Sequence, residues 1–135
     1  FIEKWLLSRL SISSNDTIYR IERINAAIEQ LCVAPQTFVT KLSSNCCLSK
    51  KQFEREFYLH VGMNPKEYSR IVRLQKALAL LQQKRNYINH AQIAYASGYA
   101  DQSHYIREFK RLSGYTPHSL LKITEPYSDL FTIPV

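Results

Sequence analysis

Residues 93–110 read IAYASGYADQSHYIREFK, and this stretch decides the fold of the 135-residue chain. It begins with a short helical pattern, turns through Gly98-Tyr99-Ala100, and restarts at Asp101, a favourable N-cap. A short helix, a sharp turn and a longer helix with a polar outer face are typical of a helix-turn-helix. Three apolar residues of the second helix recur at helical spacing and are expected to face a core: Tyr105, Phe109 and Leu112.

The same pattern occurs once more, earlier in the chain. Residues 53–57 read FEREF where residues 105–109 read YIREF, and each string is followed at equal distances by Gly and then Pro, an offset of 52 residues. Before these strings the offset is 51, so the second copy carries one extra residue in its turn. In the first copy, Ser49 and Gln52 fit a capping box. The sequence therefore predicts two related helical modules.

A helical pattern without Gly or Pro after its first turn runs from Pro65 to about Gln83 and is predicted to be one helix joining the modules. Upstream, Asn15 or Asp16 is predicted to cap a helix that Pro35 ends, separate from the amphipathic stretch Phe1 to Leu10. The predicted organisation has five parts: an upstream remnant (1–16), a first subdomain (17–63), a linker helix (64–85), a second subdomain (86–122) and a tail (123–135).

The positive charge lies on the two modules. The segment from Ser49 to Lys122 holds 13 Lys and Arg against five Asp and Glu, a net charge of +8, while the whole chain carries +7. Such a field favours a polyanionic partner, and no apolar run is long enough for a membrane span. A helix of about 19 residues is on the order of 30 Å long, close to the spacing of about 34 Å between successive major-groove faces on one side of B-DNA. One chain could therefore reach two adjacent grooves.

Patterns typical of enzymes are missing from the sequence. The four histidines lack the HxxxH or HxxEH spacing of zinc enzymes, and no phosphate-binding glycine loop or GxSxG motif occurs. Cys32, Cys46 and Cys47 lack metal-ligand spacing, so we expect buried, reduced thiols in a cytoplasmic protein. We predict no enzymatic activity, no metal and no cofactor.

Outward-facing residues of the two second helices are the candidate base contacts. Arg55 and Arg107 occupy equivalent positions and rank first, because Arg reads guanine in a bidentate manner. Glu54 could accept from cytosine, or could instead orient Arg55 or pair with a neighbouring lysine. The full predicted set is Lys51, Glu54, Arg55, Gln102, Ser103, Ile106 and Arg107, with Ile106 suited to a thymine methyl group.

Phosphate contacts are expected where helix N-termini and cations lie beside these helices. Asn64 and Thr116 each precede a proline that opens the next helix. The predicted set is Ser49, Lys50, Asn64, Lys66, Lys110, Arg111 and Thr116.

Residues 93–110, with Gly114-Tyr115-Thr116-Pro117 after them, resemble the signature of AraC/XylS-type transcriptional regulators. The first module is similar to the first half of that family's DNA-binding domain, and the resemblance covers about residues 18–122. It implies an all-α fold of about seven helices, with two helix-turn-helix subdomains joined by a long central helix. It also implies bacterial promoter regulation, usually activation through RNA polymerase. The sequence departs from the family pattern at Ser43, Cys47 and His104.

Three interpretations of the chain stay open. The first is a double-stranded DNA-binding domain, monomeric as this segment, in a regulator that dimerises through an upstream domain. The second is a helical protein-interaction module whose basic face meets an acidic partner. The third is the DNA-binding part of a DNA-repair fusion that transfers alkyl groups, which would require a reactive cysteine. Because the chain begins without Met, we expect it to be part of a longer protein.

Overall fold

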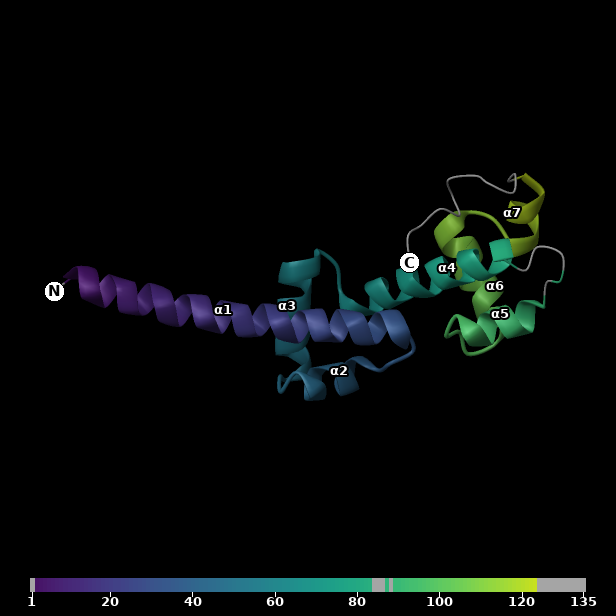
Figure 1. Ribbon diagram of the computed structural model, residues 1–135. Helices are drawn as coiled ribbons and strands as arrows, with labels where there is room; N and C mark the ends of the chain where they lie inside the picture. Colours follow the sequence, from purple (N-terminus) through teal and green to yellow (C-terminus); the bar gives the residue numbers. More distant parts are fainter. Residues whose placement is uncertain (1, 84–86, 88, 124–135) are drawn as a thin grey trace. The chain divides into compact units, whose positions relative to one another are not determined.

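The structure is a computed structural model that describes residues 2–83, 87 and 89–123, except for the side chains of 5–15. This part of the chain forms seven α-helices and no strand (Figure 1), which confirms the all-α class. The helices are α1 (Ile2–Val33), α2 (Val39–Asn45), α3 (Lys50–Val61), α4 (Pro65–Gln83), α5 (His90–Ala96), α6 (Gln102–Ser113) and α7 (Pro117–Ile123). The predicted tail lies outside the described residues from 124 onward.

The chain divides into two compact units. The first comprises Phe1–Val33 and Thr37–Lys66, and the second comprises Ala34–Gln36 and Glu67–Val135. The first unit thus contains α1, α2 and α3, and the second contains most of α4 together with α5, α6 and α7. Each unit contains one predicted helix-turn-helix and is described by itself.

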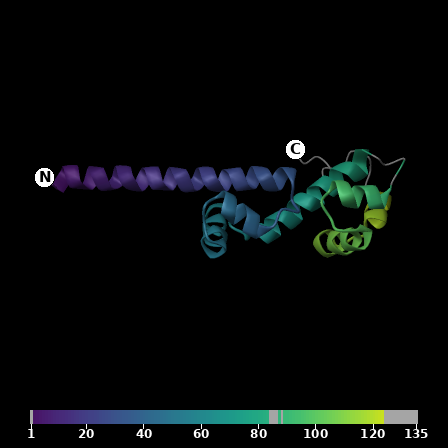
Figure 2. The same cartoon turned by 90° about the horizontal axis from the view of Figure 1, so that it is seen from below.

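Helix α1 is one unbroken helix, as Figures 1 and 2 both show. The prediction of a cap at Asn15 or Asp16, with a separate helix before it, is wrong. No Gly or Pro interrupts the sequence between Ile2 and Val33. Asp16 pairs with Arg20 one turn later, at 2.9 Å, and so supports the helix from within. The helix ends two residues before Pro35, because a residue that precedes proline disfavours the helical conformation.

The first unit packs α2 and α3 on one side of α1 (Figure 2). Seven buried residues from these elements supply the apolar core: Ile24, Ala27, Leu31, Leu42, Cys46, Phe53 and Phe57. The rings of Phe53 and Phe57, one helical turn apart, lie 5.7 Å from each other. Burial of each large apolar side chain contributes about 1.5–3 kcal/mol to folding.

The second unit packs α5, α6 and α7 with α4 around another apolar cluster. Its buried members are Ala77, Leu78, Leu81, Ile93, Ala94, Tyr99, Tyr105, Phe109 and Leu120. Leu112, which we predicted to face this core, is exposed, whereas Glu108, one helical turn before it, is buried. Position 60 of α3, which is equivalent to Leu112, is likewise exposed.

The turn of each helix-turn-helix contains one residue with positive φ. This residue is Cys47 in the first unit (φ +54°) and Gly98 in the second (φ +87°). Identical hydrogen bonds surround them: Leu48 N–H donates to Ser43 O, and Tyr99 N–H donates to Ala94 O, both at 2.9 Å. The left-handed conformation costs a non-glycine residue about 1–2 kcal/mol, so Cys47 is strained where Gly98 is not.

The expectation of three buried thiols is wrong for two of them. Cys32 and Cys47 are exposed, and only Cys46 is buried. Burial raises the pKa of the Cys46 thiol, which lies 3.4 Å from the carbonyl oxygen of Arg23.

Candidate nucleic-acid interface

Two matched helices carry the candidate DNA-contacting residues. Helices α3 and α6 each have 12 residues and end at a left-handed glycine, Gly62 or Gly114. At the start of α3 the Ser49 hydroxyl accepts from the Gln52 amide, and the Gln52 side chain accepts from the Ser49 amide, so the predicted capping box is confirmed. At the start of α6, Asp101 accepts from the His104 amide at 2.7 Å. These caps fix where each outward face begins.

Most of the predicted base contacts are exposed on these faces. Lys51 and Arg55 lie one turn apart on α3, as Ser103 and Arg107 do on α6, and Gln102 is exposed beside them. Each unit therefore brings its own candidates together. Glu54 is half-buried.

Ile106 does not have the outward position that we predicted. It is half-buried and packs against the apolar cluster of the second unit. The reason is its place directly after Tyr105, at the edge of the inward face of α6.

The candidate phosphate contacts are of two kinds: some side chains are exposed, and others cap a helix. Lys50, Lys66, Lys110 and Arg111 are exposed. The Ser49 and Thr116 hydroxyls accept hydrogen bonds from the amides of Gln52 and Ser119, so both act as helix caps. Asn64 is exposed immediately before α4.

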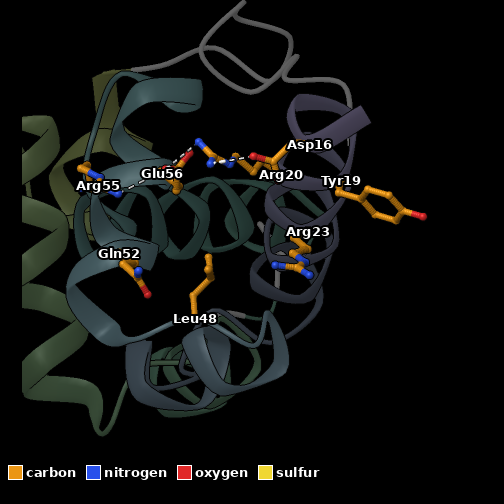
Figure 3. A pocket seen from close by; sticks show the side chains of 8 residues that line it. All are labelled: Asp16, Tyr19, Arg20, Arg23, Leu48, Gln52, Arg55 and Glu56. Carbon is orange, nitrogen blue, oxygen red and sulfur yellow. Dashed lines mark hydrogen bonds and ion pairs between the residues drawn. The ribbon is translucent and has the colours of Figure 1, made fainter. Parts of the chain in front are cut away.

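Sequence reasoning missed a buried glutamate on each of the two helices that carry the candidate base contacts, α3 and α6, which we call the recognition helices. Glu56 on α3 and Glu108 on α6 are 6% and 8% exposed, and an unpaired charge at that depth would be costly. Glu108 lies 3.2 Å from Arg70 Nε and 3.1 Å from Arg73 Nη2, both on α4. Glu56 has longer contacts, 3.6 Å to Arg20 Nη1 of α1 and 3.7 Å to Arg55 Nη2 (Figure 3).

A sequence signal for these arginines was available. Residues 20–31 of α1 and 70–81 of α4 share the pattern Arg-Ile-x-Arg-apolar-x-x-Ala-apolar-x-x-Leu at an offset of 50. The repeat therefore includes the helix before each helix-turn-helix, and three of its four arginines, Arg20, Arg70 and Arg73, meet the repeated glutamates. Each glutamate thus ties its recognition helix to the preceding long helix.

Arg107 and Arg55 differ in whether they form an ion pair with a carboxylate. Within the described part of the chain no ion pair holds Arg107, whereas Arg55 contacts the buried Glu56. In the second unit Arg70 and Arg73 satisfy Glu108, with His104 at 3.8 Å. Arg107 is therefore available to a ligand.

Among the described residues, no group of three or more His, Cys, Asp or Glu is placed to hold a metal ion. Nor is any helix in the described ranges both long and apolar enough to traverse a lipid bilayer.

Comparison with known proteins agrees with this arrangement. A profile of helix-turn-helix domains, of the type found in AraC regulators, matches residues 42–123, more than half of the chain. The chain belongs to the AraC/XylS family of transcriptional regulators. Residues 42–123 thus form the DNA-binding helix-turn-helix domain of this family.

Three relatives illustrate the range of this AraC/XylS similarity. The chain is 30% identical over 103 residues to an uncharacterized HTH-type transcriptional regulator of Haemophilus influenzae, covering 75% of this chain and 34% of the relative. It is 33% identical over 100 residues to the regulator GlxA of Rhizobium meliloti, covering 74% and 29%. It is 30% identical over 79 residues to the transcriptional activator RhaS of Escherichia fergusonii, covering 58% and 28%.

The chain thus spans about a third of the length of these AraC/XylS relatives. No solved structure shows a significant match to it.

Proposed function

We propose that this AraC/XylS chain binds duplex promoter DNA sequence-specifically, with α3 and α6 in adjacent major grooves, and activates transcription through RNA polymerase. One observation carries the proposal: Arg55 and Arg107 occupy equivalent exposed positions on two matched, capped helices. A bidentate Arg–guanine contact gives about 1–3 kcal/mol of discrimination against other bases. The relative RhaS, which is described as an activator, supports the choice of activation.

The base-contacting set that we propose is Lys51, Glu54, Arg55, Gln102, Ser103, Ile106 and Arg107. For Ile106 the half-buried position limits any contact to its outer methyl group. The phosphate-contacting set is Ser49, Lys50, Asn64, Lys66, Lys110, Arg111 and Thr116. For Ser49 and Thr116, the helix-capping role favours contact through the N-terminal amides of the helices that they cap.

The length of α4 supports adjacent grooves. Its 19 residues correspond to about 28 Å, against about 34 Å between successive major-groove faces. We also propose that this segment is monomeric, that the intact regulator dimerises through an upstream domain, and that it acts in the cytoplasm.

Selection of bound duplexes from a randomised pool tests the proposal. The unchanged chain should enrich one motif, and Arg107→Ala should relax preference at one or two adjacent base pairs, about tenfold or more per position. Lys110→Ala is the matched control on the same helix: it should weaken all sequences alike and reduce the salt dependence. An unenriched pool, or an unchanged motif in Arg107→Ala, would contradict the assignment.

A further inference from the structure

A pocket opens in the first unit between α1 and the recognition helix α3. It has a volume of about 330 Å³, within the usual range for small-molecule sites. Its lining comes from α1, from α3 and from the turn before α3: Asp16, Tyr19, Arg20, Arg23, Leu48, Gln52, Arg55 and Glu56. Figure 3 shows that the Tyr19 ring points away from the centre, while Leu48 and Gln52 border it opposite Arg23.

The second unit shows what fills the equivalent space. Leu48 corresponds to Tyr99, because both donate the same turn hydrogen bond. The Tyr99 ring is only 4% exposed. The Arg73 guanidinium lies 5.4 Å from the Tyr99 ring centroid, and the His104 ring meets Tyr99 edge-on at 5.4 Å. In the second unit an aromatic ring beneath an arginine therefore fills this position.

The first unit keeps the arginine and lacks the rings. Arg23 is equivalent to Arg73 in the repeated pattern, but Leu48 and Gln52 stand where Tyr99 and His104 do. Moreover, the Gln52 carboxamide oxygen accepts from the Ser49 amide at 3.2 Å, which turns this side chain back toward the helix cap. Three residues that line the pocket, Leu48, Gln52 and Arg23, are thus the counterparts of Tyr99, His104 and Arg73.

The charges around this pocket favour an anion. Three arginines face two carboxylates, and Arg20 already bridges Asp16 and Glu56. Within the described residues Arg23 has no ion pair, so its charge is available to a ligand.

We infer that this pocket binds a small planar aromatic carboxylate, with its ring above Leu48 and beneath the Arg23 guanidinium. The ring takes the place that the Tyr99 side chain has in the second unit, and the carboxylate is held by the arginine side chains. The occupant is thus an external molecule in one repeat and the protein's own side chain in the other.

Titration of the 135-residue chain with benzoate tests this site, with nuclear magnetic resonance shifts of the Leu48 methyl groups and the Gln52 carboxamide as the readout. Binding should saturate with a Kd on the order of 1 mM or tighter, as expected for a ligand of this size. Benzylamine, an aromatic cation, and cyclohexanecarboxylate, a non-planar anion, should each bind at least about tenfold more weakly. Because the titration contains no DNA, its result is independent of the proposed DNA binding.

Two substitutions give the decisive comparison. Leu48→Tyr supplies the ring of the second repeat and should weaken benzoate binding about tenfold or more. Arg23→Gln removes the cation that would stack on the ring, and it should also weaken benzoate binding about tenfold or more. If Leu48→Tyr fails to fold, the benzoate affinity of Arg23→Gln alone tests the inference. Leu59→Tyr is the matched control, since Leu59 is exposed on α3 and is not part of the pocket lining; it should change nothing. Equal binding by Arg23→Gln, equal binding of the three probes, or no saturable shift would overturn the inference.

Discussion

The two units of this protein use the same buried glutamate differently. In the second, Glu108 is held by Arg70 and Arg73 of α4 at 3.2 and 3.1 Å, and the proposed base-contacting arginine, Arg107, is free of ion pairs among the described residues. In the first, Glu56 has contacts of 3.6 and 3.7 Å, one of them with Arg55, the other proposed base-contacting arginine. The difference teaches that the same buried glutamate can pair only with arginines of the preceding long helix in one copy, and also engage a candidate DNA-contacting arginine in the other.

The turns of the two helix-turn-helix motifs differ as well, and again the second unit has the more favourable arrangement. Gly98 adopts its left-handed conformation without strain, and Pro35 and Gln36 lie close enough to crowd a Cβ at this position. Cys47 adopts the same conformation with a side chain attached. The second unit thus has the better-satisfied turn as well as the better-satisfied ion pairs.

The largest expected effect is that of Gly98→Ala. Its Cβ would lie 2.9 Å from the Gln36 side-chain oxygen and 3.0 Å from Pro35 Cγ, on a backbone with φ +87°. We expect a loss of about 2–3 kcal/mol in the free energy of unfolding, measured by urea denaturation. Gly114→Ala is the control, because its φ is +81° but no atom lies within 4 Å; it should cost only about 1 kcal/mol. Equal costs would show that the close approach at Gly98 is unimportant.

A smaller effect should separate the two buried glutamates. Glu108→Gln leaves two largely buried arginines without a carboxylate, and should cost about 2 kcal/mol. Glu56→Gln leaves Arg20 and Arg55, which are 50% and 67% exposed, and should cost less than about 1 kcal/mol. Amide hydrogen exchange, which reports on each unit separately, provides the measurement. If the two variants lost the same amount of protection against amide exchange, the ion pairs of Glu56 and Glu108 would contribute equally to stability, contrary to this prediction.

The smallest effect is expected from Cys47→Gly. Glycine relieves the left-handed strain but is more flexible in the unfolded chain, so the first unit should gain about 0.5 kcal/mol. Cys47→Ser controls for loss of the thiol. Because serine keeps a Cβ at the same φ, this variant should bring no gain in the stability of the first unit. Thermal denaturation under reducing conditions compares the two. Lower stability of the glycine variant would mean that the cysteine backbone is not strained.

Features that depend on nearby residues could be predicted from the sequence. The capping box at Ser49, the cap at Asp101 and the bounds of α4 all follow from side chains within one helical turn of the features that they fix. The prediction failed at Asn15 and Asp16, where a residue type suited to capping lies inside a helix that no Gly or Pro interrupts. It failed at Ile106 because a residue beside the inward face can be half-buried.

The sequence by itself therefore determined the two helix-turn-helix modules, their outward arginines and the family, because periodicity, caps and turns are local. Only the tertiary structure decided which arginine neutralises which glutamate, and that a ring fills the space beneath Arg73 but not beneath Arg23. Apart from the pair of neighbours Arg55 and Glu56, these contacts join residues that lie at least 26 positions apart in the chain, as Arg73 and Tyr99 do. The physical reason is that burial and charge compensation depend on what packs against a side chain, and the residues that pack there come from a different helix.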